Sequence, residues 1–163
     1  MAEHGGQRRR LVMVPSPLQG HMTPMLQLAT YLHSQNFSTT IAHSDFNPPN
    51  SSNHPYLTFL PLPTNTSGTD ISAGFTNFFK TLNNNCKTHL HNHLIQIINA
   101  QNNSFDKESV VVIHENLTIF VGIVVDNLGS PAILLRGSSA AFFPNIKSSR
   151  LHICLGLMEE EFW

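Results

Sequence analysis

Charged side chains are scarce in this chain of 163 residues. Lys, Arg, Asp and Glu together make up 12% of the residues, and the formal net charge is −1 at pH 7, whereas charged residues are about a quarter of ordinary globular domains. Because the chain lacks the basic excess with which proteins bind nucleic acid, we expect no nucleic-acid partner. One basic cluster, Arg8-Arg9-Arg10, is interpreted as part of a flexible leader over residues 1–10.

Cysteines and long apolar runs are scarce as well. The two cysteines, Cys86 and Cys154, lie far apart in the sequence and form no metal-binding or redox motif. No apolar run approaches the length needed to span a bilayer, and the N-terminus carries no apolar signal-peptide core. We therefore expect a cytoplasmic protein with free thiols and no membrane span.

Several motifs of common enzyme classes are missing. The first apolar run is followed by Pro-Ser-Pro-Leu-Gln-Gly, which is neither a G-x-G-x-x-G fingerprint nor a P-loop, and no G-x-S-x-G elbow is present. Three histidines, His89, His91 and His93, fit a metal site poorly. On a helix His89 and His93 share a face but His91 does not, and no nearby carboxylate or cysteine completes a ligand set. We expect a polar helix surface there and no metal.

Strand and helix signals alternate along the chain. Apolar or β-branched runs predict strands, and apolar residues spaced by three or four predict helices. The predicted strands are 11–14, 37–42, 56–60, 110–113 and 132–135, and the predicted helices are 24–35, 75–82, 87–100, 117–128 and 137–143. Residues 43–55 are expected to form a loop, and residues 151–163 resemble part of a helix. The alternation predicts an α/β fold with a Rossmann-like, doubly wound, mainly parallel sheet.

The stretch from residue 11 to residue 35 carries the strongest functional signal. Prolines end the first strand, and Thr23 and Pro24 are expected to cap and open the following helix. His21 then stands at the helix entrance, at the carboxyl end of a strand, where open α/β sheets bind their ligands. A neutral imidazole can take a proton from a hydroxyl when a carboxylate orients its other nitrogen. Glu115, which follows the 110–113 strand, is the best-placed acid, although a structural histidine explains the spacing equally well.

Several separate motifs resemble one family over nearly the whole chain. They are residues 11–29 (LVMVPSPLQGHMTPMLQLA), 33–43, 46–50, 59–63, 112–117 and 135–141. Together they resemble the N-terminal, acceptor-binding half of plant UDP-dependent glycosyltransferases, and residues 43–63 most resemble the subgroup of steviol-glycoside, cytokinin and iridoid glucosyltransferases. The resemblance implies a GT-B fold of two Rossmann-like domains and sugar transfer with inversion and no metal. Residues 11–163 are then an N-terminal domain that is incomplete at its C-terminal end, and the C-terminal donor-binding domain is absent.

The resemblance also implies roles for individual residues. His21 is the general base that deprotonates the acceptor hydroxyl, and Glu115 is the acid beside it. The acceptor is expected to contact Ser16, Pro17, Leu18, Gln19, Phe142 and Phe143, and the donor is expected to lie near Gly20, Gly137 and Ser138. The implied donor is UDP-glucose, which binds only when the C-terminal domain is present. The implied acceptor is a terpenoid, phenolic or hormone alcohol, and no cofactor is needed.

Two positions depart from the pattern of the family. Glu115 stands where aspartate is usual, and Gly137 stands where threonine is usual. Because the extra methylene shifts the carboxylate by about 1 Å, we expect Glu115→Asp to raise the rate of transfer. We expect the 163 residues alone to be inactive. The alternative function is that of a non-catalytic truncated paralogue, which binds small hydrophobic molecules or has no function.

Overall fold

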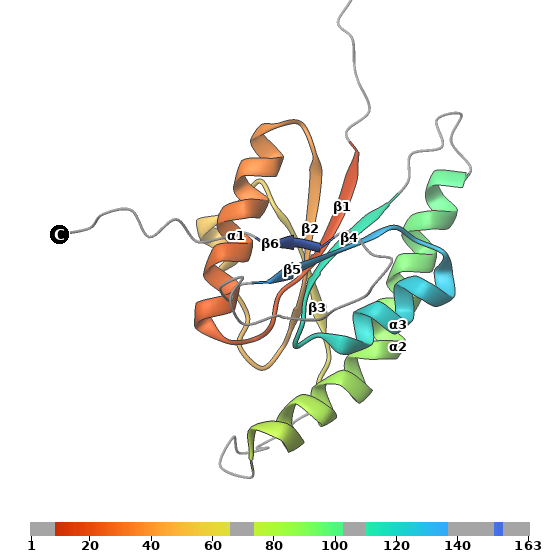
Figure 1. Cartoon of the computed structure of the whole chain (residues 1–163). Helices are drawn as coiled ribbons and strands as arrows, with labels where there is room; N and C mark the ends of the chain where they lie inside the picture. The colour runs from red at the N-terminus through yellow and green to blue at the C-terminus, as the bar shows by residue number, and fades with distance from the viewer. Residues whose placement is uncertain (1–8, 66–73, 103–109, 137–151, 155–163) are drawn as a thin grey trace, which may run out of the picture.

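The computed structural model describes residues 9–65, 74–102, 110–136 and 152–154, and their strands form one sheet (Figure 1). The strands are β1 (Arg10–Val14), β2 (Ser38–Ser44), β3 (Thr58–Leu62), β4 (Val111–Glu115), β5 (Ala132–Arg136) and β6 (His152–Cys154). The helices are α1 (Gln19–Ser34), α2 (Phe75–Asn102) and α3 (Ile119–Leu128), with a 3-10 turn η1 (Ser51–Asn53). Neighbouring strands are parallel, in the order β3-β2-β1-β4-β5-β6. This is the strand order of a doubly wound Rossmann-like sheet, so the predicted fold class is confirmed.

Helices cover both faces of the sheet, with α1 on one face and α2 and α3 on the other (Figure 1). Alternate residues of β1 pack on opposite faces of the sheet, since successive side chains of a strand point to opposite sides. Val12 and Val14 pack in the core under α2 and α3, whereas Met13 packs with Met25 and Ala29 of α1. Burial on both faces explains why the first strand is a continuous apolar run.

Two strands extend beyond their predicted ends. β2 includes His43 and Ser44, so the predicted loop at 43–55 is wrong at its first two residues. β3 continues through Pro61, where Pro61 stands opposite His43. Proline is tolerated there because β3 lies at the edge of the sheet, where one side of the strand has no ladder that needs an N–H donor.

Helix α1 begins earlier than the sequence predicts. Its first residue is Gln19, and the Leu18 carbonyl accepts hydrogen bonds from the N–H groups of His21 and Met22, both at 2.9 Å. The predicted cap at Thr23 is therefore wrong, and Pro24 lies inside the helix. Pro24 removes one backbone donor near the start of the helix, which a long helix with a packed face can tolerate.

The two helices predicted at 75–82 and 87–100 are one continuous helix, α2. Asparagines weaken helices when their side chains compete for the nearby backbone. Here Asn83 donates a hydrogen bond to the Leu117 carbonyl, and Asn85 donates one to the Thr64 carbonyl. Because these amides bond to other parts of the chain, the helix passes through the polar segment that the sequence suggests as a break.

The end of the chain also differs from the prediction. Residues 152–154 form strand β6, which pairs with β5, so the helix expected at 151–163 is wrong over these residues. The free edge of β5 offers backbone groups that a further strand can pair. The helix predicted at 137–143 lies outside the described residues. None of the described helices is long and apolar enough to cross a membrane.

Cys86 is a free, buried thiol, as expected, and belongs to the face of α2 that packs in the core. Burial, and to a lesser degree the charge of Asp45, raises the pKa of this thiol to about 12. A thiol that stays protonated is a poor nucleophile, so Cys86 is a packing residue.

Candidate active site

The structure brings His21 and Glu115 together at the carboxyl edge of the sheet. β1 and β4 are parallel neighbours, with Val14 opposite His114, so the turns that follow them leave from the same edge. Glu115 is the last residue of β4, and His21 lies in the first turn of α1. The Nδ1 atom of His21 lies 2.8 Å from Oε2 of Glu115, which is a hydrogen-bonded ion pair when the ring is protonated.

The two partners differ in their exposure. Glu115 is 4% exposed, and its Oε2 also accepts a hydrogen bond from the backbone N–H of Ser16 at 3.3 Å. A buried carboxylate is costly unless donors surround it, and these two donors fix its position. The side chain of His21 is 32% exposed. Its ring is therefore held at one nitrogen while the rest of it is accessible.

The hydrogen bond to Glu115 selects the tautomer of His21. A carboxylate only accepts, so the neutral imidazole carries its proton on Nδ1 and its lone pair on Nε2. Among the described residues no hydrogen bond occupies Nε2. An imidazole with this tautomer and a buried carboxylate behind it has the chemistry that a general base needs.

The loop between β1 and α1 is held from several sides. Ser16 and Pro17 are buried, and the side-chain amide of Asn47 donates to the Pro17 carbonyl at 3.0 Å. Leu18 is half-buried against the core under α2 and α3. The Ser16 hydroxyl is buried and finds no partner among the described residues. The loop is therefore fixed in place, and it offers a ligand its backbone and the side chains of Leu18 and Gln19 more than those of Ser16 and Pro17.

The other predicted site residues fall into two groups. Gln19 and Gly20 are exposed at the start of α1, and a Cβ atom added to Gly20 would meet nothing within 4 Å among the described residues. No close approach in this part of the chain therefore explains the glycine. The remaining predicted residues, Gly137, Ser138, Phe142 and Phe143, lie outside the described residues.

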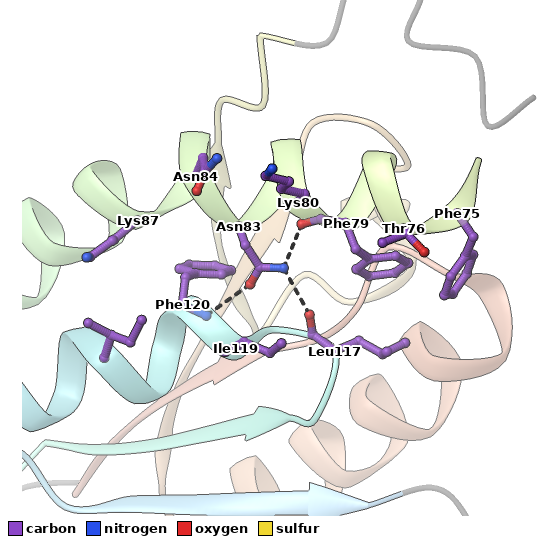
Figure 2. A pocket seen from close by; sticks show the side chains of 11 residues that line it. Phe75, Thr76, Phe79, Lys80, Asn83, Asn84, Lys87, Leu117, Ile119 and Phe120 are labelled. Carbon is purple, nitrogen blue, oxygen red and sulfur yellow. Dashed lines mark hydrogen bonds between the residues drawn. The ribbon is translucent and has the colours of Figure 1, made fainter. Parts of the chain in front are cut away.

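An apolar pocket between α2 and α3 is the feature that sequence reasoning missed (Figure 2). Its volume is about 540 Å³, and its lining is Phe75, Thr76, Phe79, Lys80, Asn83, Asn84, Lys87, Leu117, Ile119, Phe120 and Ile123. Leu117 lies two residues after Glu115, so the pocket begins next to the turn that carries the acid. The apolar character of residues 117–128 on more than one helix face is the signal that points to a second covered surface.

Asn83 joins the pocket to the turn after β4. Its amide nitrogen donates to the carbonyls of Phe79 at 2.6 Å and Leu117 at 3.3 Å, and its amide oxygen accepts from the Phe120 N–H at 2.9 Å (Figure 2). Thr118, the residue before α3, supplies no side-chain cap to that helix, so Asn83 satisfies one of its free N–H groups from α2. The turn between Glu115 and α3 is thereby fixed to a second helix.

The three histidines at 89, 91 and 93 lie on helix α2. Within the described ranges, no three or more His, Cys, Asp or Glu side chains gather where they would hold a metal ion.

Known proteins resemble the chain in sequence and in fold. No protein-family model matches it. UDP-glycosyltransferase 76H1 of Stevia rebaudiana is 55% identical over 118 residues, a match that covers 71% of this chain and 27% of that protein. UDP-glycosyltransferase 76E1 of Solanum lycopersicum is 38% identical over 135 residues, which cover 83% of this chain and 28% of that protein. The chain thus spans just over a quarter of the length of these relatives.

Solved glycosyltransferase structures contain the same fold. UGT2 of Phytolacca americana, solved with UDP-2fluoro-glucose and pterostilbene, matches with a TM-score of 0.64 at 18% identity, over 83% of this chain and 32% of that one. LpCGTa, solved with UDP, matches with a TM-score of 0.60 at 21% identity, over 83% of this chain and 31% of that one. At these identities the likeness establishes the fold, that of a Rossmann-like domain of GT-B enzymes.

Proposed function

This chain is related to the plant UDP-glycosyltransferases of the 76 group, and we propose that it is the acceptor-binding part of an enzyme that transfers glucose from UDP-glucose to a hydroxyl of a small hydrophobic molecule. The observation that carries the proposal is the contact between His21 Nδ1 and Glu115 Oε2 at 2.8 Å, at the edge of the sheet where Rossmann-like domains bind ligands.

The proposed reaction uses the free nitrogen of His21. Nε2 accepts the proton of the acceptor hydroxyl as its oxygen attacks the anomeric carbon of glucose from the side opposite UDP. The new C–O bond forms, the bond to the diphosphate breaks, and the configuration at that carbon inverts. Glu115 stabilises the imidazolium that results, and the step needs no metal. Proximity and orientation of the two substrates supply much of the rate.

The donor is proposed to bind mainly to a second domain. Gly20, Gly137 and Ser138 are the residues of this chain proposed to lie near it, and Gly137 offers no hydroxyl where the family usually has threonine. We propose that the Ser16–Gln19 loop, the pocket between α2 and α3, and Phe142 and Phe143 surround the acceptor, which is a terpenoid, phenolic or hormone alcohol. UDP-glucose would then be bound productively only when the second domain is present.

A fusion protein tests this proposal. The chain is joined to the part of UDP-glycosyltransferase 76H1 that its match does not cover, and product is measured with UDP-glucose and a panel of phenolic and terpenoid alcohols. We expect β-glucoside from the fusion and none from the 163 residues alone. A folded fusion that binds UDP yet makes no product would contradict the proposed activity. Turnover by the unfused chain would contradict the need for a second domain.

The second candidate function is binding of small hydrophobic molecules without transfer. One observation favours it: the described residues that line the pocket of about 540 Å³ all lie within 75–87 and 117–123, so these two segments form it without a donor site. Ligand binding by the unfused chain, together with an inactive fusion, would support this function over the enzymatic one.

A further inference from the structure

Two lysines stand beside the apolar pocket between α2 and α3. Lys80 and Lys87 lie seven residues apart on α2, which places them on the same face of the helix two turns from each other. Opposite them, the wall is formed by aliphatic and aromatic side chains that include Leu117, Ile119 and Phe120 (Figure 2). The pocket therefore combines an apolar wall with a basic side.

Within the described residues, no acidic side chain balances the charges of these two lysines. Both side chains are exposed, and neither forms an ion pair within the part of the chain that the structure describes. Among the described residues that line the pocket, none is acidic. Glu115 is two residues from Leu117 of the pocket wall, but its carboxylate is buried and hydrogen-bonded to His21 and to the Ser16 N–H, so it does not balance the charge of the lysines. A ligand with one negative charge would supply the missing counter-charge.

The apolar wall excludes a purely polar anion. Ile119 is 66% exposed and Phe75 is 51% exposed, so both gain from contact with an apolar body. A volume of about 540 Å³ is in the range of pockets that enclose small organic molecules. Lysine is a compact point charge that pairs with a carboxylate without needing bidentate geometry, and a carboxylate adds less polar surface to an apolar ligand than a phosphate does.

We propose that this pocket binds a small apolar carboxylic acid, with its carboxylate at Lys80 and Lys87 and its body against the wall formed by Leu117, Ile119 and Phe120. Lys80 and Lys87 then determine which ligands are preferred. A role of this acid as the glycosyl acceptor rests on the proposed function and on the position of Leu117 two residues from Glu115. Binding of the acid to the pocket does not depend on the proposed function.

A matched pair of probes tests the proposal on the full chain. 1-Naphthaleneacetic acid and its methyl ester share one apolar body and differ in charge, and their dissociation constants are measured by fluorescence titration. We expect the acid to bind about fivefold more tightly, a modest factor because exposed ion pairs are weak. High salt should weaken binding of the acid and leave the ester unchanged.

Three variants locate the effect. In the double variant Lys80→Gln/Lys87→Gln, the acid should bind no better than the ester, while the ester keeps its affinity. Arg10→Gln, which removes an exposed charge outside this pocket, should keep the preference for the acid. Ile119→Ser should weaken both probes, and its exposed position makes unfolding of this variant an unimportant risk.

Several outcomes would overturn the proposal. Equal affinities for acid and ester in the parent chain, or an unchanged preference in the double lysine variant, would reject the carboxylate. Absence of binding by both probes would reject the pocket as a site for small apolar acids. The titration needs no sugar transfer, so an inactive fusion leaves this result standing. A fusion that glucosylates neutral and acidic alcohols equally well would reject only the preference for acids.

Discussion

The two strand–helix units that meet at the site, β1–α1 and β4–α3, share one topology and differ in their turns. In the first unit, the Pro15–Leu18 loop leads to His21, a half-exposed residue in the first turn of α1. In the second unit, Glu115 is the last residue of the strand and is 4% exposed. The loop of one unit and the strand end of the other place the two side chains 2.8 Å apart.

Under the proposed function, this difference gives each unit a separate task. A base has to meet its substrate, so it is useful on an accessible helix turn. An orienting acid has to stay in one position, and burial with two donors holds it there. His114 is a useful comparison, because it is the last residue of β4 that pairs with β1 and yet is only 4% exposed. Its Nδ1 atom lies 3.1 Å from the Glu115 carbonyl oxygen. Under the proposed function, a histidine at a strand end also has to be accessible to act as the base, and His21 meets this condition whereas His114 does not.

Removal of the base should have the largest effect on this division of tasks. In the fusion with 76H1, His21→Ala should lower kcat by about 10²- to 10⁴-fold, the usual contribution of a general base. His89→Ala, a histidine on α2 outside the site, is the matched control and should retain activity. A loss of less than about tenfold for His21→Ala would show that another group accepts the proton.

Changes at the acid should have a smaller effect. Glu115→Ala should lower kcat of the fusion on the order of 10²-fold, because the imidazole loses its fixed orientation. The geometry reverses the expectation for Glu115→Asp: the glutamate already reaches Nδ1 at 2.8 Å, so a side chain shorter by one methylene should lower the rate. Glu115→Gln keeps the length and removes the charge, which separates the two contributions. A faster aspartate variant would show that the observed contact is not the productive one.

The parts of the site that follow from local pattern could be predicted from sequence. The apolar run of β1, the prolines after it and the acid after the 110–113 strand indicate a base and an acid at strand ends. Their contact also requires that β1 and β4 be neighbours, which the alternation of strands and helices allows but does not dictate. The parallel register of Val14 with His114 supplies that missing information.

Two of the features that the sequence did not predict depend on tertiary contacts, and a third depends on a choice between two possible helix starts. The start of α1 at Gln19 competes with a favourable cap at Thr23, and local preference alone chooses the wrong one. The continuity of α2 depends on distant partners of Asn83 and Asn85. The pocket exists only because α2 lies against α3, so no single segment of sequence contains it.

The support of the second turn by α2 gives a prediction for stability. Asn83→Ala should lower the free energy of unfolding of the chain by about 2 kcal/mol, because the Leu117 carbonyl and the Phe120 N–H lose their partner. Asn84→Ala removes the same side chain from an exposed position one residue on and should change stability by less than about 0.5 kcal/mol. Urea denaturation measures both. Equal losses would show that the bonds to Asn83 contribute nothing beyond helix propensity.

The smallest predicted effects come from the helix ends, where the two units are most alike. α1 closes at Asn36 with φ 68°, and α3 closes at Gly129 with φ 62°. In each case the next N–H reaches back over five residues, from Phe37 to the Leu32 carbonyl at 3.1 Å and from Ser130 to the Val125 carbonyl at 3.0 Å.

The two helix ends share the left-handed φ and the hydrogen-bond pattern, and they differ in the residue that adopts it. Exchanging that residue tests whether backbone strain alone determines the loss of stability. Gly129→Ala should lower the free energy of unfolding by about 1 kcal/mol, since a Cβ there meets none of the described residues within 4 Å and the penalty lies in the left-handed backbone. Gly129→Asn should lose less, because asparagine tolerates this conformation, as Asn36 does in α1. Asn36→Gly should be close to neutral and Asn36→Ala destabilising. If the Gly129→Ala and Gly129→Asn variants unfold at the same urea concentration, the loss of stability has a cause other than the backbone angle.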